Sequence, residues 1–329
     1  MPTVAFLEVV APEDGEQILR SFPDALQSAK NLQEENLLEQ CKDAEVLSVF
    51  IYSTVGEREL KALPRLKLLC TRSVGYDHID LAACQKRGVM VCNVPDYGAH
   101  VIAEHVFALL LSALRHIPEG DDRVESGAFD YRGLRGKTLR GKTLGIVGTG
   151  KIGCRVAQIA NGFGMKIIAV DRCRNIELEE LLHVQYVLLE EALARSDILS
   201  LHVPATEETQ HMINAKTIQQ MKNGVVIINT ARGTLIDSSA LLDALESGKV
   251  SYALLDVLEH EKETGKDAAL IAHPNAITTP HIAFYADDSM RNMYDDCFES
   301  IEQWRDGKTP EHVVRPPQLV CDLPGIQCK

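Results

Sequence analysis

Three short segments combine residue types that together could deliver a proton to a carbonyl group beside a bound anion. They are residues 229–233, which contain Arg232, residues 256–261, which contain Glu259, His260 and Glu261, and residues 279–281, which end in His281. Each follows a predicted strand, and ligands of open α/β sheets bind beyond the carboxyl ends of the strands. An arginine can hold a carboxylate, a histidine can deliver a proton, and a glutamate beside it favours its charged form. The segments predict reduction of an anionic carbonyl compound.

A glycine-rich segment could bind the phosphates of a dinucleotide. Gly148-Thr149-Gly150-Lys151-Ile152-Gly153 follows an apolar run and opens a predicted helix over residues 154–163. Gly148 would permit a tight turn, Gly150 a close approach to a pyrophosphate, and Gly153 close packing of helix on strand. Asp171, 23 residues after Gly148, ends the next predicted strand, where it could bind the ribose 2′-OH. The pattern predicts NAD, while Arg172 and Arg174 keep NADP open as an alternative.

Short apolar runs alternate with longer amphipathic segments along the chain, which is typical of βαβ units and an α/β fold. The predicted strands of the first hundred residues are 3–9, 46–51, 66–71 and 89–93, with a helix over 32–41. A second series comprises 144–147, 166–170, 186–189, 198–203, 225–229, 252–256 and 276–279. Its strands are apolar nearly throughout, so helices should cover both faces. We expect two doubly wound parallel sheets, a buried or interface helix over 101–117, and a loop or arm over 118–140.

Composition limits the classes of partner. The chain has 329 residues, enough for two domains, and its 47 acidic and 34 basic residues give a net charge of −13. This charge repels phosphate backbones and anionic membranes, so we expect neither nucleic acid nor membrane as a partner. An anionic substrate would need a local basic group, for which Arg232 is the best candidate.

The cysteines and histidines also carry expectations. The nine cysteines have no paired spacing, and the N-terminus lacks the basic region of a secretory leader. We therefore expect reduced thiols and a cytoplasmic protein. No H-x-x-x-H or H-E-x-x-H pattern occurs, so no metal site is predicted.

Across essentially its whole length, the sequence resembles the NAD-dependent D-2-hydroxyacid dehydrogenases. The motifs that carry the resemblance are Arg72-Ser73-Val74-Gly75-Tyr76-Asp77-His78-Ile79-Asp80, Asn93-Val94-Pro95, Ala103-Glu104-His105, the glycine segment, residues 230–233, Asp256 with Glu261 five residues later, and Pro280-His281. The resemblance implies a Rossmann cofactor domain inserted in a flavodoxin-like substrate domain. We expect residues 1–98 to form the substrate domain, 99–296 the dinucleotide-binding domain, and 297–329 a segment that returns to the substrate domain.

The resemblance also assigns roles to residues. It implies Arg232 as the anchor of the substrate carboxylate and carbonyl, His281 as the acid-base, and Glu261 as its partner. Residue type alone leaves Glu259 and His260 as competitors, and the family's five-residue offset from Asp256 selects Glu261. Besides the glycine segment and Asp171, the predicted cofactor-binding residues are His202, Val203, Pro204, Thr230, Ala231, Arg232 and Asp256. The predicted substrate-binding residues are Ser73, Val74 and Gly75, through backbone N–H groups, and Tyr52, Tyr97 and Phe284 as pocket walls.

Departures from the broad family indicate a branch. Lys262 stands where many members have proline after the glutamate, and residues 282–285 replace a glycine-rich segment after the histidine. With Tyr97, these features resemble the D-lactate dehydrogenases, including the vancomycin-resistance relatives. Ala99 and His100 stand where proline and asparagine are usual in that branch. The resemblance implies a homodimer that interconverts a small 2-keto acid, most simply pyruvate, and its D-2-hydroxy acid, D-lactate.

Other functions stay open at this point. Non-catalytic NAD-sensing corepressors share the fold, and another 2-keto acid, such as hydroxypyruvate or phenylpyruvate, could be the substrate. Oxidation of formate or phosphite is a further alternative. The formate type normally has glutamine where Glu261 stands, and the phosphite type lacks Tyr97 and Phe284-Tyr285.

Overall fold

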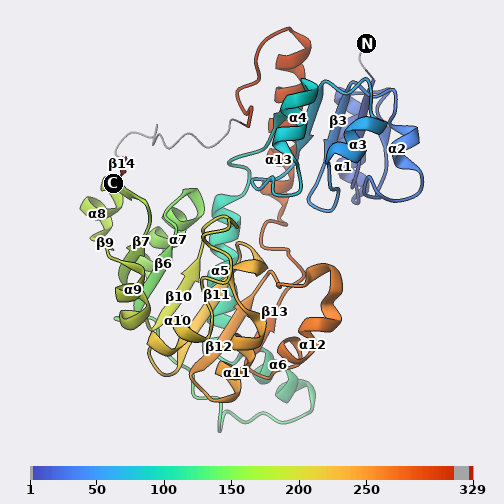
Figure 1. Ribbon diagram of the computed structural model, residues 1–329. Helices are drawn as coiled ribbons and strands as arrows, with labels where there is room; N and C mark the ends of the chain where they lie inside the picture. Colours follow the sequence, from blue (N-terminus) through green and yellow to red (C-terminus); the bar gives the residue numbers. More distant parts are fainter. Residues whose placement is uncertain (1–2, 315–325, 329) are drawn as a thin grey trace. The chain divides into compact units, whose positions relative to one another are not determined.

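The chain passes from one structural unit to another after Gly98 and leaves the second after Tyr285. The computed structural model describes residues 3–314 and 326–328. The first unit comprises the described residues up to Gly98 and from Ala286 to Val314, and the second runs from Ala99 to Tyr285 and includes strand β14 (Ile326–Cys328). Figure 1 colours both along the sequence. The expected return at residue 297 falls inside one helix, α13 (Asp287–Arg305), so the observed crossing lies about ten residues earlier.

The first unit contains a five-stranded parallel sheet in the order β2-β1-β3-β4-β5. This is the flavodoxin-like order. Four of its strands were predicted, and the two-residue β2 was not, since it is too short to give a periodic pattern. The strands are β1 (Val4–Phe6), β2 (Leu26–Gln27), β3 (Val46–Val49), β4 (Leu68–Thr71) and β5 (Met90–Cys92).

Helices cover both faces of this sheet. They are α1 (Pro12–Ser21), α2 (Leu37–Gln40), α3 (Glu57–Ala62), α4 (Leu81–Arg87) and α13. The rings of Phe6, Phe22 and Phe298 pack at centroid distances of 5.1 to 5.7 Å on the face that α1 and α13 cover. This burial explains why α13, drawn in orange-red, returns to the blue unit in Figure 1.

The second unit contains a seven-stranded parallel sheet in the order β13-β12-β11-β10-β6-β7-β9. Counted from its own first strand, this is the Rossmann order with a seventh strand added. The strands are β6 (Thr143–Val147), β7 (Lys166–Val170), β9 (Gln185–Tyr186), β10 (Ile198–Leu201), β11 (Val225–Asn229), β12 (Val250–Leu255) and β13 (Ala276–Thr278). A separate antiparallel pair joins β8 (Cys173–Asn175) to β14. The predicted class, α/β with two doubly wound parallel sheets, is confirmed.

Alternate residues of the second sheet enter two different cores. Val226 and Ile228 belong to a cluster that includes α5 and α7, whereas Val225 and Ile227 belong to a cluster that includes α10 and α11. Because both faces are buried, the strands are apolar at consecutive positions. The helices are α5 (Ala99–Leu114), α6 (Ile117–Glu125), α7 (Lys151–Gly162), α8 (Ile176–Leu182), α9 (Leu189–Arg195), α10 (Ala215–Gln220), α11 (Ser238–Glu246) and α12 (Ala268–Ile271), with 3-10 turns η1 (Gly233–Leu235) and η2 (Glu261–Asp267).

Three local expectations need correction. The helix predicted over 32–41 is only α2, because Glu35 and Asn36 have positive φ angles and the Glu34 carboxylate accepts the Asn31 N–H in a turn before it. The segment 118–140 is not all loop, since α6 occupies its start with Pro118 in the first turn, where the missing N–H costs nothing.

The third correction concerns the thiols. Cys173 is in a disulfide, against the expectation of reduced thiols, whereas six other described cysteines are free.

No single helix of residues 3–314 and 326–328 is long and apolar enough to cross a membrane; α5 and α6 together reach that length only with a 58° bend.

Candidate active site

His281 and Glu261 meet beyond the carboxyl ends of β13 and β12. His281 Nδ1 lies 3.3 Å from Glu261 Oε2. A carboxylate only accepts hydrogen bonds, so this contact assigns the Nδ1 proton to His281 and leaves Nε2 as the other ring position. The His281 side chain is 20% exposed and its φ of 55° is in the left-handed region. The predicted pair is thus in contact, on a backbone that the surrounding structure must hold in place.

The competing residues have other partners. Glu259 pairs with His211 and accepts the backbone N–H of Ser238 at the start of α11. His260 contacts the buried Asp267 through both its backbone N–H and its Nδ1. Glu261 is therefore the glutamate that contacts His281, and Glu259, two positions earlier, contacts a different histidine.

Asp256 accepts several hydrogen bonds from the loop that carries His281. It is 1% exposed, and its carboxylate accepts the backbone N–H of Ile282 at 2.8 Å and of Ala283 at 2.9 Å. It also accepts Thr279 Oγ1 at 2.5 Å, and the backbone carbonyl of Asp256 accepts the His281 N–H. Asp256 was predicted to bind the cofactor, but these bonds suit a residue that positions the loop.

His105, on α5, completes this support. Its Nε2 lies 3.1 Å from Thr279 Oγ1. Because Thr279 donates its proton to Asp256, the hydroxyl accepts from His105. Sequence reasoning did not single out Thr279 or His105 for this task; the only signal was their place in the motifs Thr279-Pro280-His281 and Ala103-Glu104-His105.

Arg232 lies on the loop that follows β11. Asn229 ties this loop together, since its amide donates to the Arg232 carbonyl at 2.8 Å and accepts the Ala231 N–H at 3.0 Å. Next in sequence, Gly233 packs so closely that an added Cβ would lie 1.9 Å from the carbonyl oxygen of Leu258. The loop that carries Arg232 is therefore pressed against the loop that carries Glu261. Only glycine fits at this position, a constraint that the sequence alone did not indicate.

The three glycines of the 148–153 segment have different surroundings. Gly148 has a φ of 98°, and a Cβ there would lie 2.7 Å from the backbone of His202. A Cβ on Gly153 would lie 2.0 Å from the carbonyl oxygen of Gly148, so helix and strand pack too closely for any side chain. At Gly150 a Cβ would meet nothing within 4 Å, and the φ of −64° suits any residue. The chain itself does not need glycine there, which fits a position left open for a pyrophosphate beside the N-terminus of α7.

Asp171 is fixed to the glycine segment. Its Oδ2 accepts the backbone N–H of Thr149 at 2.6 Å and the Thr149 hydroxyl at 2.9 Å. Tyr186 donates to that hydroxyl in turn, at 2.9 Å. Arg172 and Arg174, which left NADP open, are ion-paired with Glu208 and Glu179. These contacts fit NAD, because a 2′-phosphate would meet a fixed carboxylate and two arginines already engaged with acids.

Two buried polar atoms beyond β10 and β11 have no hydrogen-bond partner among residues 3–314 and 326–328. They are His202 Nδ1 and Thr230 Oγ1. His202 Nε2 lies 2.8 Å from Ser200 Oγ, and burial lowers the pKa of the ring to about 4. Val203 also borders the glycine turn, 3.0 Å from where a Gly148 Cβ would be. Unsatisfied groups beside the glycine segment fit a site that a bound dinucleotide completes.

The remaining predicted cofactor residues are placed around this turn. Lys151 and Ile152 open α7, Pro204 accepts the Thr209 hydroxyl in the next loop, and Ala231 precedes Arg232. Within residues 3–314 and 326–328, no group of three His, Cys, Asp or Glu side chains could hold a metal ion.

The predicted substrate residues of the first unit follow β3, β4 and β5. The Ser73 hydroxyl donates to the Gly75 carbonyl at 2.6 Å, and the Asn93 amide donates to the Val74 carbonyl at 2.8 Å. In the described part of the chain the backbone N–H groups of Ser73, Val74 and Gly75 donate to no acceptor. Three consecutive donors in a loop suit an anion.

The aromatic wall candidates differ in exposure. Tyr52 is 51% exposed and Tyr97 is buried in the first unit. In the second unit, Phe284 contacts the ring of His281 edge-on, at a centroid distance of 6.3 Å.

Comparison with known proteins finds similarity to dehydrogenases and reductases of 2-hydroxy and 2-keto acids. Residues 107–283 match the family described as D-isomer specific 2-hydroxyacid dehydrogenase, NAD binding domain. The D-lactate dehydrogenase of Aquifex aeolicus, in a crystal structure complexed with NAD and lactic acid, has a TM-score of 0.88 and 36% identity, and the match covers 96% of this chain and 100% of that one. The D-lactate dehydrogenase of Treponema pallidum is 41% identical over 72% of this chain and 74% of its own length. A glyoxylate reductase of Pyrococcus furiosus is 33% identical over 99% of each chain.

The family match covers more than half of the chain, and the relatives extend it over nearly all of the rest. The cofactor domain, the parallel sheets and the glycine segment agree with it. The chain belongs to the NAD-dependent D-2-hydroxyacid dehydrogenase family, in its D-lactate dehydrogenase branch.

Proposed function

We propose that this protein catalyses the reversible, NADH-dependent reduction of pyruvate to D-lactate. The observation that carries the proposal is the Glu261–His281 contact, next to the Arg232 loop that Gly233 presses against the residues before Glu261. The Aquifex aeolicus structure, which contains NAD and lactic acid, supports this substrate. A proton donor beside a cationic anchor is what reduction of a 2-keto acid requires.

NAD would be held by the glycine turn, Asp171 and the groups beyond β10 and β11. When bound, the reduced cofactor supplies the hydride. Arg232 holds the substrate carboxylate and stabilises the negative charge that develops on the carbonyl oxygen. His281 gives the proton from Nε2 while Glu261, on Nδ1, favours the charged ring. Asp256, through Ile282 and Ala283, keeps the His281 backbone in its left-handed conformation.

The substrate residues of the first unit are part of the proposal. The N–H groups of Ser73, Val74 and Gly75 bind the carboxylate, and Tyr52, Tyr97 and Phe284 limit the size of the 2-keto acid. We expect these aromatic side chains to favour pyruvate over bulkier acids, because one extra methylene of a substrate changes specificity by about 10–200-fold.

Steady-state rates of NADH oxidation across a panel of 2-keto acids test the substrate. The panel contains pyruvate, hydroxypyruvate, glyoxylate, 2-oxobutyrate, oxaloacetate and phenylpyruvate, with NADPH in parallel. We expect the highest kcat/KM with pyruvate and NADH. A preference for glyoxylate, the substrate in the name of the Pyrococcus furiosus relative, would replace the proposal by that of a glyoxylate reductase. Tight NADH binding without turnover of any acid would indicate a non-catalytic NAD sensor instead.

We also propose a homodimer formed through the region of α6 and the segment that follows it. Ile117, Val124, Phe129 and Tyr131 are all more than half exposed, the two aromatic rings almost completely. Apolar side chains gathered on one segment are typical of an interface. Light scattering should give twice the chain mass of 36.3 kDa, and a monomer at micromolar concentration would contradict the proposal.

A further inference from the structure

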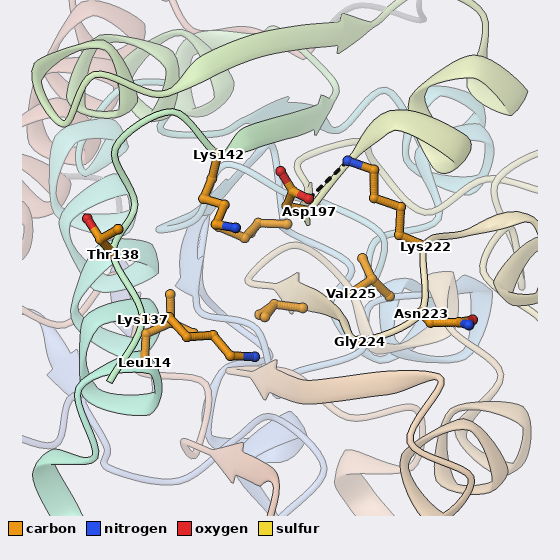
Figure 2. Close-up of a pocket in the computed structure, with 11 residues that line it drawn as sticks. Leu114, Lys137, Thr138, Lys142, Asp197, Lys222, Asn223, Gly224 and Val225 are labelled. Atoms are coloured by element: carbon orange, nitrogen blue, oxygen red, sulfur yellow. Dashed lines mark hydrogen bonds and ion pairs between the residues drawn. The ribbon is translucent and has the colours of Figure 1, made fainter. Parts of the chain in front are cut away.

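A polar cavity lies at the amino ends of the strands of the seven-stranded sheet, whereas the glycine segment lies at their carboxyl ends. It has a volume of about 260 Å³ and is lined by residues that precede three adjacent strands, among them Lys142 before β6, Asp197 before β10 and Lys222 before β11. Lys137, on the segment that leads to β6, extends into it (Figure 2). Gly148 and Lys142 are at opposite ends of β6. The cavity is therefore separate from the dinucleotide site.

One of the three lysines has a structural partner. Asp197 Oδ1 accepts Lys222 Nζ at 2.9 Å, and Oδ2 accepts the backbone N–H of Thr143 at 2.8 Å. Burial raises the pKa of Asp197, but the Thr143 N–H and the Lys222 and Lys142 ammonium groups outweigh it, so the pKa lies below its ordinary value. Asp197 is thus a charged carboxylate that neutralises Lys222 and links β6 to β10.

The other two lysines have no such partner. Among residues 3–314 and 326–328, neither the Lys137 nor the Lys142 ammonium group makes a hydrogen bond or an ion pair. Figure 2 shows Lys142 and Lys222 approaching Asp197 from two sides, with Lys137 reaching toward the Gly224 side of the cavity. With one carboxylate for three ammonium groups, the cavity keeps two uncompensated positive charges.

The basic charge continues beyond the cavity wall. Lys137 and Thr138 also line a neighbouring cavity, with Arg115 and Arg140. Neither arginine has an acidic partner in the described part of the chain. In a protein with a net charge of −13, such a concentration of unpaired cations makes a local positive potential that attracts anions.

The size of the cavity limits the ligand. Sites for drug-sized molecules have volumes of roughly 300–1,000 Å³, and this one is smaller. Two free ammonium groups match a doubly charged anion, and lysine binds phosphate as a point charge. We propose that the cavity between Lys137, Lys142 and Lys222 binds the phosphate group of a small metabolite, either as free phosphate or as a phosphate ester of a short carbon chain.

Binding can be measured with the whole protein under saturating NADH, which occupies the dinucleotide site. Isothermal titration with inorganic phosphate and with glycerol 3-phosphate, which has no carboxylate for the active site, distinguishes the two sources of the group, and sodium chloride at matched ionic strength controls for screening. We expect saturable binding of at least one phosphate compound. In the Lys137→Ala/Lys142→Ala variant, its affinity should fall at least tenfold.

The matched control is Lys216→Ala, because Lys216 is an exposed lysine of the same unit that does not line the cavity. Its affinity for phosphate should equal that of the wild type. Lys142→Glu, which reverses one charge and keeps a long side chain, should abolish binding, and the unfolding temperature without phosphate checks that each variant folds. Equal affinity in the wild type and the double variant, or a response that chloride reproduces, overturns the proposal. A change of oligomeric state without a change in phosphate affinity would assign the lysines to a contact between copies and likewise overturn it.

Discussion

Both sheets place an arginine and a glutamate directly beyond their strands, but the two sets are held in different ways. In the five-stranded sheet, Arg72 is 1% exposed and donates to Ser48 Oγ and to the Leu7 carbonyl. Its guanidinium lies 5.2 Å from the centre of the Tyr294 ring. The buried Glu8 accepts three backbone N–H groups and one hydroxyl from the loop that follows β3. These contacts all lie within the protein, although Arg72 Nε is buried without a hydrogen-bond partner among the described residues.

In the seven-stranded sheet, the same residue types are open to solvent and to ligands. Arg232 is half-buried, the Glu261 side chain is 37% exposed, and the ring of His281 is accessible. His202 Nδ1 and Thr230 Oγ1, beyond β10 and β11, are buried without a hydrogen-bond partner in the part of the chain that the structure describes. An arginine beyond a strand is therefore a candidate for ligand binding only where solvent reaches it, as it reaches the half-buried Arg232 and not the 1% exposed Arg72.

The largest effect should come from Arg232→Ala. Because Arg232 holds the substrate carboxylate and the developing oxyanion, kcat should fall by about 10²–10³-fold and KM should rise. The free energy of unfolding should change by at most about 1 kcal/mol, because the half-buried Arg232 side chain belongs to neither hydrophobic core. Steady-state kinetics and urea unfolding measure the two quantities. If the Arg232→Ala variant has the kinetics of the wild type, Arg232 is not part of the active site and does not differ from Arg72 in function.

Arg72→Met should lower the stability of the protein and leave its activity nearly unchanged. The methionine keeps the apolar stem but leaves the Leu7 carbonyl and Ser48 hydroxyl buried without their donor, at a cost of about 2–4 kcal/mol in unfolding free energy. Trp304, the only tryptophan of the chain, lies on α13, so its fluorescence reports urea unfolding of the first unit. The kcat of the folded fraction should stay within about threefold of the wild type. A stable variant would show that the buried hydrogen bonds of Arg72 contribute nothing.

Beyond the second sheet, Glu261 and Glu259 can be compared with each other by the same substitution. Glu261→Gln keeps the size of the side chain but removes the carboxylate that accepts the Nδ1 proton of His281, so kcat should fall about 10–100-fold. Glu259→Gln is the matched control, because Glu259 lies two residues away and pairs with His211 instead. It should leave kcat close to the wild-type value. Equal losses in both variants would mean that charge near the site, rather than the Glu261–His281 contact, supports the ring.

Sequence reasoning reached the α/β class, most of the strands and the cofactor motif, because these depend on local patterns. Consecutive apolar residues in β7 and β11 gave their exact bounds, and Gly148, Gly150 and Gly153 stand in the order that the turn requires. The packing of Gly233 on Leu258 depends on two loops about 25 residues apart and has no local signature. The same is true of the Asp256–Thr279–His105 chain. The short α2 was misjudged because Glu35 and Asn36 take left-handed conformations that no apolar period reveals.

The smallest effect should come from the buried ring of His202, through the pH dependence of the unfolding free energy. Burial lowers the pKa of His202 from 6.5 to about 4, so the folded protein keeps this ring neutral while the unfolded chain takes up a proton below pH 6.5. The unfolded state then binds more protons, and stability is lost as the pH falls from about 6.5 to about 4. His202→Asn removes this contribution, so its loss of unfolding free energy between pH 7 and pH 5 should be about 1–2 kcal/mol smaller than that of the wild type. Urea unfolding followed by circular dichroism measures the difference, and His183→Asn, at an exposed histidine with a positive φ that asparagine tolerates, is the control. Parallel pH curves for the wild type and His202→Asn would show that the His202 ring is hydrated in solution, so that it is not an unsatisfied group that a ligand completes.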